Sequence, residues 1–526
     1  MSLDGSLNLI IMKVLLSFLI LLTIDSSAQQ KTNIIYIMSD DHDADAISAY
    51  NKSFIKTPNI DRLAKEGMLF NRAFVGNSIC SPARATLLTG QHSHMNGLKD
   101  NRTVFDSSKL TMPKLLQAAG YQTALVGKWH LHSYPTGFDY WKILPGQGLY
   151  HDPRMITMKR DTVTEKGYTT DVITNEAISW LDNRDKNKPF LLLLHHKAPH
   201  RNWMPRLKFL QITSKQVFPE PPTLYANMND HAKAWQTQRM SILNDMTLCT
   251  DLKIDPAYLE NIPELKPNDN EVRGYQASFN RIPLEEREAL KAIYAERGKL
   301  VQQYYTDKKQ FLKVKYQWYM QDYMACVASV DENVGKLLDY LDKNNLSQNT
   351  LVMYTGDQGF YFGENGWFDK RWMYDVSMQA PLLMRWPGKI KAGSVNNALV
   401  QNIDFAPTIM DAAGATVPSW MQGISLKPNI TGKQKELPRN YLYYHYYEYP
   451  IDHYVLPHLG VRGENHKLVY FYTLNEWEFY DLKKDPDEQK NLIHSANQQD
   501  LIKKYKQELL KLRDQYNDHE AAGELN

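Results

Sequence analysis

The chain has 526 residues, of which 43% are hydrophobic and 23% are charged, an ordinary composition for a globular protein. This length exceeds one average domain and predicts a large domain followed by a smaller one. The formal net charge of +2 argues against a general nucleic-acid binder, whose surface would be strongly basic, but it leaves room for a local basic pocket.

The N-terminus has the pattern of a secretory signal. Lys13 precedes a short apolar run over residues 14–22, and Ser-Ser-Ala at 26–28 favours cleavage before Gln29. The run is short for a membrane span, so an N-terminal anchor is the less favoured alternative. We therefore predict a signal peptide over residues 1–28 and a secreted or periplasmic protein without a membrane span in its mature chain.

The next part of the chain alternates buried strands with amphipathic helices. Continuous apolar runs predict strands over residues 33–38, 121–126, 190–194 and 350–354. Apolar residues at helical spacing predict helices over residues 58–67, 113–120, 170–184 and 316–342. This repeated alternation is typical of an α/β fold with a doubly wound, mostly parallel sheet.

A cluster of polar side chains follows each of the four predicted strands. In chain order the clusters contain Asp40 and Asp41, then Lys128 and His130, then His200, and finally Asp357 and Gln358. Sites in doubly wound sheets collect beyond the carboxyl ends of the strands. The sequence therefore predicts that these clusters contribute to one site.

The rest of the chain is predicted as an insertion and a second domain. Residues 203–312 are polar, aromatic and weakly periodic, with several short helical segments, and we interpret them as an insertion over the active-site face. A break near residues 428–438 predicts a linker. Beyond it, antiparallel strands are predicted over 441–449, 467–472 and 477–482, and a closing helix over 498–516. The predicted domains are a catalytic domain over 29–432 and a smaller C-terminal α+β domain over 433–526.

The segment from Asn77 to Gly90 places a lone thiol, Cys80, at the start of a predicted helix. Pro82 fits the first helical turn, and Gly90 is a natural stop. Free N–H groups at a helix start favour an anion, and Arg84 lies one turn further on. A lone cysteine is most often a structural residue. The pattern Cys-x-Pro-x-Arg followed by Leu-Thr-Gly is much less common by chance.

On Cys80, Pro82, Arg84, Thr89 and Gly90 the chain resembles the formylglycine-dependent (type I) sulfatases. The resemblance implies the alkaline-phosphatase-like sulfatase fold and a maturation enzyme that oxidises Cys80 to formylglycine. In this family one hydroxyl of the aldehyde hydrate attacks sulfur, and the other later expels sulfate by collapsing back to the aldehyde. Many members have Ser where Ala83 stands, but maturation reads only Cys, Pro and Arg.

Three carboxylates and one amide oxygen form an all-oxygen set that suits a hard cation such as Ca²⁺ or Mg²⁺: Asp40, Asp41, Asp357 and Gln358. Taken alone, an Asp-Asp pair more often caps a helix. The resemblance implies that one calcium ion is held here, although family members have Asn or His where Gln358 stands.

Cationic residues for the sulfate come from further family signatures. The resemblance implies that Lys128 and His130 contact the sulfate or the formylglycine oxygens, although an isolated Lys-x-His pair is more often an exposed Lys and a packed His. Lys370 matches the second sulfate-binding lysine. His200 matches the histidine that protonates the leaving oxygen, a task that suits a pKa near the unperturbed value. With Arg84, these side chains would stabilise charge on the sulfate oxygens.

Substrate-side residues are expected on either side of Lys370. Asp369 and Arg371 would contact sugar hydroxyls, with a solvated charge run as the alternative, and His458 of the C-terminal domain would reach the pocket. Asp357 would draw off the proton of the nucleophile, and His130 would assist collapse of the sulfo-enzyme. Two segments, residues 146–153 and 200–205, look like the N-acetylglucosamine-6-sulfatase or mucin-desulfating branch, which acts on heparan- or mucin-type glycans.

The sequence thus predicts a sulfuric ester hydrolase that removes the 6-O-sulfate of N-acetylglucosamine from a sulfated glycan. The alternatives are a sulfatase of another sugar or position, a phosphonate or phosphodiester hydrolase of the same superfamily, and a sulfated-glycan binding protein that keeps the Cys80 thiol. Cys249 and Cys326 either pair or stay free.

Overall fold

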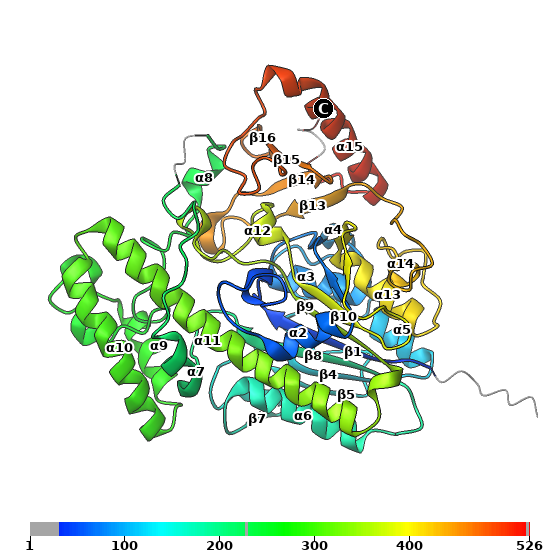
Figure 1. Ribbon diagram of the computed structural model, residues 1–526, viewed down its shortest axis with the longest axis horizontal. Coiled ribbons are helices and arrows are strands. Elements are labelled where there is room, and N and C mark those ends of the chain that lie inside the picture. The colour runs from blue at the N-terminus through cyan, green and yellow to red at the C-terminus, as the bar shows by residue number, and fades with distance from the viewer. Residues whose placement is uncertain (1–30, 227–229, 522–524, 526) are drawn as a thin grey trace, which may run out of the picture.

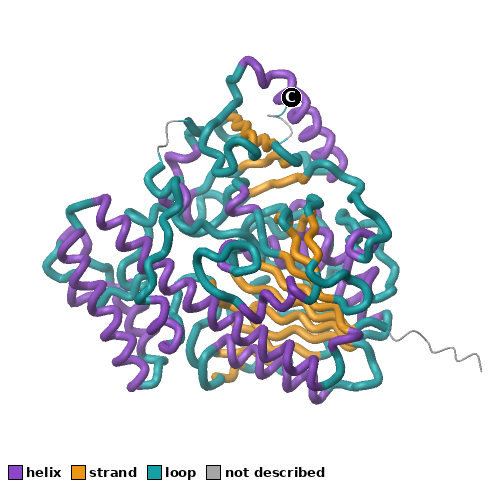
Figure 2. The backbone as a smooth tube through the Cα atoms, in the orientation of Figure 1, coloured by secondary structure: helices purple, strands orange, loops and turns teal. Residues whose placement is uncertain are grey.

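The computed structural model describes residues 31–226, 230–521 and 525, and the predicted signal peptide lies outside these ranges (Figures 1 and 2). Within them the strands form a ten-stranded sheet, a two-stranded ribbon and a four-stranded antiparallel sheet near the C-terminus. This arrangement confirms the predicted fold class, a mostly parallel α/β sheet with a smaller antiparallel one. Across the described ranges, every helix is too short or too polar to cross a membrane.

The centre of the large sheet is built from the four predicted strands. The order is β11-β2-β10-β9-β1-β8-β4-β5-β6-β7, so β9, β1, β8 and β4 are consecutive neighbours. β1 pairs in parallel with β8 and with β9, and β4 pairs in parallel with β8. Their bounds are β1 (Asn33–Asp40), β4 (Gln122–Lys128), β8 (Phe190–Pro199) and β9 (Thr350–Gly356).

In the large sheet and the two-stranded ribbon, the strands that were not predicted are short, and most of them lie away from the centre of the large sheet. They are β2 (Met68–Phe70), β5 (Tyr140–Leu144), β6 (Arg154–Thr157), β7 (Thr162–Thr164), β10 (Leu382–Arg385), β11 (Ser394–Asn396), and the ribbon strands β3 (Ala73–Phe74) and β12 (Val400–Gln401). Runs of two to five residues carry too little period to separate a strand from a turn.

Helices cover both faces of the large sheet, as a doubly wound fold requires. Ile35 and Ile37 of β1 belong to one hydrophobic cluster, and Ile34, Tyr36 and Met38 belong to another, because successive side chains of a strand point to opposite faces. The first cluster includes residues of α2 (Pro58–Lys65), α6 (Thr169–Asn183) and α11 (Lys308–Lys343). The second includes residues of α3 (Cys80–Thr89), α5 (Met112–Ala118) and α13 (Phe405–Ala412).

The stretch 203–312 differs from its prediction of short helices only, because α10 (Leu284–Tyr304) has 21 residues. Its buried positions include Arg297 and Gly298 beside Leu290, Tyr294 and Val301, so a charge interrupts the apolar stripe that would have marked the helix. The shorter helices of this stretch are α7 (Leu207–Thr213), α8 (Ala234–Thr237) and α9 (Asp269–Phe279).

The C-terminal part is a four-stranded antiparallel sheet with a helix on one face (Figure 1). The sheet contains β13 (Leu442–Tyr446), β14 (His458–Arg462), β15 (His466–Phe471) and β16 (Glu476–Asp481), and α15 (Gln499–Tyr516) covers it. The opposite face packs against Trp372 and Tyr374, which belong to the segment after β9. The sequence did not predict β14. The described residues also form three short α-helices elsewhere in the chain: α4 (Ser93–Asn96), α12 (Asp375–Met378) and α14 (Lys427–Ile430).

A buried ion pair joins α10 to the long helix α11. Both Nη atoms of Arg297 donate to the carboxylate of Asp322, at 2.7 and 2.8 Å, and both side chains are almost fully buried. Burial raises the pKa of Asp322, although the Arg297 charge opposes that shift.

Replacing one partner of this pair should destabilise the protein strongly. Arg297→Met leaves the Asp322 carboxylate buried without its cation, and we expect it to lower the free energy of unfolding by about 3–5 kcal/mol in urea titrations. Arg297→Met combined with Asp322→Leu should recover most of that loss. Lys299→Met, which removes an exposed cation from the same helix, is the matched control and should leave the midpoint unchanged. Equal stability of the single and double variants would contradict this account.

Candidate active site

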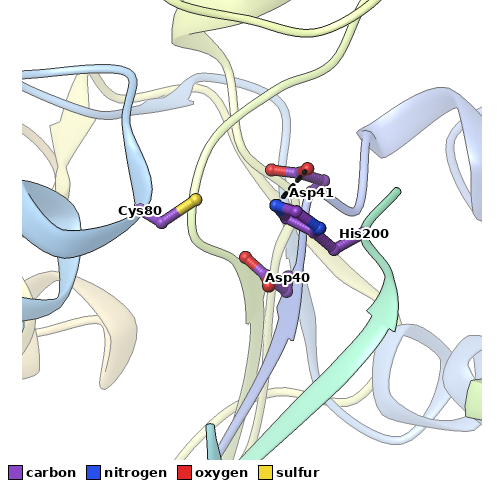
Figure 3. Close-up of side chains that lie close together, drawn as sticks. All are labelled: Asp40, Asp41, Cys80 and His200. Carbon is purple, nitrogen blue, oxygen red and sulfur yellow. Dashed lines mark ion pairs between the residues drawn. The ribbon is translucent and has the colours of Figure 1, made fainter. Parts of the chain in front are cut away.

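The four clusters that follow the central strands meet at one edge of the large sheet. Asp40 ends β1, Lys128 ends β4, His200 follows β8, and Asp357 follows β9. Figure 3 shows Asp40 and Asp41 from the end of β1, His200 from the end of β8 and Cys80 from α3 around a common centre. One possible ligand atom from each of these four lies within 4.8 Å of the others.

Cys80 is the first residue of α3. Its helix N-cap, Ile79, has no side-chain hydrogen bond to the first turn, and Gly90 ends the helix with a φ of 63°. Burial raises the pKa of the Cys80 thiol well above its usual value, so the sulfur carries a proton at neutral pH. The sequence prediction of a thiol at a helix start, closed by Gly90, is therefore confirmed.

Three carboxylates lie beside Cys80 and interact with one another. The Asp41 amide donates to Oδ1 of Asp357 at 2.9 Å. Burial, followed by repulsion from Asp40, raises the pKa of Asp357 to about 8. Burial also raises the pKa of Asp41 to about 6. Although burial opposes the shift, Lys128 and other cations hold the pKa of Asp40 well below its usual value.

The residues around these carboxylates fit a hard cation. Oδ1 of Asp40 and Oε1 of Gln358 are buried and have no hydrogen-bond partner among the described residues. A buried oxygen without a donor is costly, and carboxylate and amide oxygens are the ligands that Ca²⁺ and Mg²⁺ prefer. A positive ion at this position would also offset the mutual repulsion of the carboxylates.

Each carboxylate also has a cationic side chain as a partner. Nη2 of Arg84 lies 3.2 Å from Oδ2 of Asp357 and 3.5 Å from Oδ1 of Asp40. Nζ of Lys128 donates to Asp40, and Nζ of Lys370 donates to both oxygens of Asp41, at 2.6 and 2.8 Å. All three cations are buried, so the edge of the sheet holds a compact, nearly balanced set of charges.

The two predicted histidines lie close to this set of charges. Nε2 of His200 lies 3.6 Å from Oδ2 of Asp41, and Nδ1 of His130 lies 3.3 Å from the Ser81 hydroxyl. Burial, with repulsion from Lys128, holds the pKa of both rings well below 6.5. The expectation of a nearly unperturbed pKa for His200 is therefore wrong, because the ring is buried next to a lysine.

Four predicted site residues have a strained backbone conformation. Asp41, His130, Asp369 and Arg371 have φ values of 59°, 55°, 79° and 97°. This left-handed region is unfavourable for residues other than glycine and is found where the surrounding structure fixes a functional side chain. Lys370 therefore sits between two residues whose backbone is held in an unusual conformation.

A cavity of about 740 Å³ opens beside this group and is lined by Lys197, His200, Asp369, Lys370 and Arg371. Asp369 and Arg371 are only 2% and 4% exposed, which excludes the alternative of a solvated charge run. Nε of Arg371 lies 3.3 Å from Asp369, and its Nη1 lies 3.2 Å from Glu448 of the C-terminal part.

The structure does not bring His458 to this cavity. Its ring is fully buried in β14, where Nδ1 faces the Leu456 carbonyl at 2.8 Å and Nε2 accepts from the Met373 amide at 3.1 Å. The expected substrate contact is therefore replaced by a packing role. The reason is that residues 458–462 form a strand, which was missed in the sequence.

His453, five residues earlier, lines the cavity instead. Its Nε2 lies 3.3 Å from Oδ2 of Asp369. Gln147 also lines the cavity and accepts from Lys128. Neither had a role assigned from the sequence: His453 lies in an irregular loop, and only the fold brings it to Asp369. Gln147 lies in the segment 146–153, whose family likeness was the available signal.

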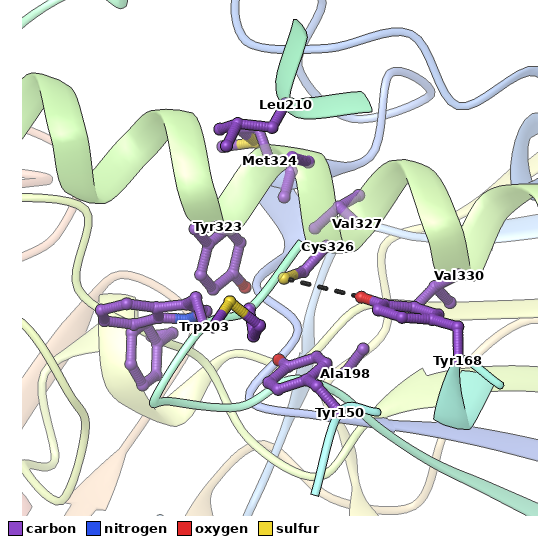
Figure 4. Packing of buried hydrophobic residues seen from close by; sticks show 14 of the residues in the cluster. Tyr150, Tyr168, Ala198, Trp203, Leu210, Tyr323, Met324, Cys326, Val327 and Val330 are labelled. Carbon is purple, nitrogen blue, oxygen red and sulfur yellow. Dashed lines mark hydrogen bonds between the residues drawn. The ribbon is translucent and has the colours of Figure 1, made fainter. Parts of the chain in front are cut away.

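Figure 4 shows aromatic side chains, among them Tyr150, Tyr168 and Tyr323, in the packed region next to α11. The Tyr150 hydroxyl donates to the His200 carbonyl at 2.7 Å, and the Tyr323 hydroxyl of α11 donates to the Asp41 carbonyl. Cys326 lies in the same packed region, 4.0 Å from the Tyr168 hydroxyl. Cys249 and Cys326 are both free thiols, which settles the alternative left open by the sequence.

Comparison with known proteins agrees with this geometry. A family model described as "Sulfatase" matches residues 32–415, and one described as "N-sulphoglucosamine sulphohydrolase, C-terminal" matches residues 363–515. An N-acetylglucosamine-6-O-sulfatase of Bacteroides thetaiotaomicron is 45% identical over 497 residues, covering 93% of this chain and 88% of that protein. The human N-acetylglucosamine-6-sulfatase is 26% identical and covers 77% of this chain and 66% of its own length.

Solved structures have the same fold. One, a complex of a protein with its substrate D-glucosamine-2-N,6-O-disulfate, has a TM-score of 0.89 and 45% identity, and covers 94% of this chain and 99% of that one. A phosphonate monoester hydrolase of Silicibacter pomeroyi has a TM-score of 0.67, covers 93% and 96% of the two chains and is 18% identical, so it supports the fold alone. This chain therefore belongs to the sulfatase family, the hydrolases of sulfuric esters, because it matches the family model, is 45% identical to a member over nearly its whole length and has the same fold.

Proposed function

We propose that this sulfatase removes the 6-O-sulfate of N-acetylglucosamine from heparan- or mucin-type glycans. The observation that carries the proposal is the convergence of Cys80 with Arg84, Lys128 and Lys370 beside a cavity large enough for a sugar. The relative that shares 45% identity is an N-acetylglucosamine-6-O-sulfatase, and the solved structure with the same identity binds a 6-O-sulfated glucosamine.

Cys80 is the residue that we assign to the nucleophile, after conversion to formylglycine by a maturation enzyme. The hydrated aldehyde supplies a hydroxyl that attacks sulfur. The position of Cys80 supports this role, because it lies at the start of α3 beside Lys370 and Lys128, two of the cations proposed to bind the sulfate. Asp357 is the carboxylate assigned to take the proton of the nucleophile.

One calcium ion is the proposed metal, held by Asp40, Asp41, Asp357 and Gln358. When bound, it supplies positive charge against the oxygens of the sulfate group. Arg84, Lys128 and Lys370 provide the remaining cations, and their buried positions make each charge more effective than it would be in water. His130 also faces this group of charges, and we assign it to assist release of sulfate from the enzyme.

His200 is the proposed proton donor to the departing sugar oxygen. Its pKa is depressed by burial and by the cations around it. A bound sulfate ester brings negative charge next to the ring, and an opposite charge at close range favours the protonated form. Asp369 and Arg371 line the cavity beyond Lys370 and are assigned to the sugar hydroxyls, with His453 beside Asp369.

We also propose that residues 1–28 direct secretion or periplasmic export. The domain boundaries proposed from the sequence, at residue 432 with an insertion over 203–312, fit the positions of the two main sheets and of the helices α7 to α10.

Hydrolysis of a phosphonate or phosphodiester remains a second candidate activity. Comparing turnover of a sulfate ester with that of a phosphodiester separates the two.

Removing the thiol of Cys80 should abolish catalysis. We expect Cys80→Ala to release no sulfate from N-acetylglucosamine 6-sulfate, because the formylglycine precursor is gone. The tryptic peptide that contains Cys80 should be about 18 Da lighter than its thiol form in the matured enzyme, a change of covalent composition. Cys249→Ala, at a buried thiol away from the cavity, is the control and should keep activity. Undiminished sulfate release by Cys80→Ala would refute the assignment.

Removing divalent metal should inactivate the enzyme and lower its thermal stability. Chelation with EDTA leaves three buried carboxylates with less positive charge around them, and saturating Ca²⁺ at about 100 times its Kd should restore about 2.7 kcal/mol. Differential scanning fluorimetry reads this shift without any turnover. Asp41→Asn should reduce the Ca²⁺-dependent shift, whereas Asp245→Asn, in the cavity wall, should preserve it. A Tm that changes neither with EDTA nor with added Ca²⁺ would contradict the proposed metal site.

Replacing His200 should matter most for substrates whose leaving group needs a proton. His200→Gln should lower kcat for a sugar sulfate by about 10²–10⁴-fold, the usual contribution of a general acid. With 4-nitrophenyl sulfate, whose phenolate leaves without protonation, the loss should be less than about tenfold. Steady-state kinetics on both substrates give the comparison. Equal losses on the two would assign His200 to binding rather than to proton transfer.

A further inference from the structure

The cavity beside the candidate active site is far more basic than the chain as a whole. Seven lysine or arginine side chains line it, against three aspartates, whereas the net charge of the whole protein is only +2. Clefts lined by one sign of charge concentrate ligands of the opposite sign. A cation of the cavity can attract a ligand anion more strongly when it has no carboxylate partner within the protein.

Three of the seven cations have a carboxylate partner. Lys370 pairs with Asp41, Arg371 with Asp369 and Glu448, and Arg201 with Asp251 at 2.6 Å. The other four have no carboxylate oxygen within 4.0 Å among the described residues, and they are Arg102, Lys197, Arg239 and Arg281. Among the described residues, the cavity therefore holds four cations that make no ion pair, and two of them, Arg102 and Arg239, are exposed.

Lys197 is the deepest of these four and is only 4% exposed. Its amine makes one long hydrogen bond, 3.4 Å to the Arg201 carbonyl, and lies 4.5 Å from the centre of the Tyr150 ring. A buried ammonium group without an anion is costly. Consistent with that cost, burial and the neighbouring Lys128 lower the pKa of Lys197 to about 8, although the charges of Asp40 and Asp41 oppose the shift. Its place in the cavity wall favours an anion supplied from outside.

The three arginines come from three separate segments of the chain. Arg102 lies in the loop after α4, Arg239 lies between α8 and α9, and Arg281 lies between α9 and α10. The Arg239 guanidinium lies 4.4 Å from the Tyr454 ring, and its amide donates to the His453 carbonyl at 2.7 Å. Arg239 is thus fixed next to His453, while the stretch 203–312 supplies both Arg239 and Arg281.

We propose that this cavity contains a second anion subsite, formed by Lys197, Arg102, Arg239 and Arg281, which binds a negatively charged group of the substrate other than the scissile sulfate. The inference rests on the proposed function and names its substrate class. One sulfate ester already has Arg84, Lys128 and Lys370 as partners. The four further cations match a glycan that carries additional sulfates or carboxylates, as glycosaminoglycans do, rather than a neutral glycan with an isolated sulfate.

The test compares substrates that differ in whether they carry a second anion and in which ring carries it. We would measure kcat/KM for N-acetylglucosamine 6-sulfate, for glucosamine 2-N,6-O-disulfate, and for a disaccharide that links the 6-sulfated sugar to a uronic acid. The variant combines Arg102→Gln, Arg239→Gln and Arg281→Gln. Lys186→Gln is the matched control, because Lys186 is an exposed cation in the loop before β8, at the opposite edge of the sheet.

We expect the triple variant to lower the preference for a dianionic substrate over the monosulfated one by about tenfold, since each partly exposed ion pair adds a modest factor. A loss of preference for the disulfated monosaccharide places the second anion on the same ring, and a loss confined to the disaccharide places it on the neighbouring ring. Lys186→Gln should leave the preference unchanged. An equal fall in kcat/KM on all three substrates, or no preference in the wild type, would overturn the subsite.

Calorimetry separates failure of the subsite from failure of the proposed function. If the wild-type protein releases no sulfate from any of the three sugars, the proposed function is wrong. Binding of the same sugars to Cys80→Ala, with and without the three arginine substitutions, then tests the subsite without turnover. Affinity for the dianionic sugars that falls with the substitutions supports it, and unchanged affinity refutes it.

Discussion

Three buried carboxylates at one edge of the large sheet, Asp40, Asp41 and Asp357, are the constraint on which the rest of the site depends. They lie together because β1 and β9 are parallel neighbours, so the residues that follow both strands emerge side by side. Charges of one sign cannot be buried together without compensation. Arg84, Lys128 and Lys370 reach the same point from three other segments and give each carboxylate a partner. The arrangement thus concentrates positive side chains where a sulfate group and a metal ion are proposed to bind.

The rest of the molecule holds this edge in place. Tyr323 of α11 binds the Asp41 carbonyl, and Tyr150 binds the His200 carbonyl, so α11 and the loop after β5 fix the ends of β1 and β8. From the C-terminal sheet, the Tyr444 hydroxyl accepts from the Ser78 amide at 3.2 Å and donates to the Arg371 carbonyl at 2.7 Å. One side chain of the small sheet therefore joins the Cys80 loop to the loop that carries Lys370. This contact adds to the hydrophobic cluster that packs the C-terminal sheet against the segment after β9.

The residues that line the cavity come from two kinds of structure. The end of β8 contributes Lys197 and His200, whose positions are set by regular backbone pairing. The other lining residues come from loops, including the stretch 203–312 and the segment of His453. Loops on a rigid scaffold can change without altering the core. The strand ends are therefore suited to a common sulfate chemistry, and the loops are suited to selecting which sugar and which further anions bind.

The sequence by itself determined the fold class, the four central strands and the positions of Cys80, Asp40, Lys128, His200 and Asp357 at helix or strand ends, because hydrophobic period and the residues next to it are local signals. It did not reveal α10, where the buried Arg297 interrupts the apolar stripe. It also did not reveal β14, the strand in which His458 is buried. Only the tertiary structure decided that His453 faces Asp369, that burial depresses the pKa of His200, and that four cations of the cavity lack a carboxylate partner among the described residues. Such properties depend on burial and on contacts between segments far apart in the chain, and local sequence carries no record of either.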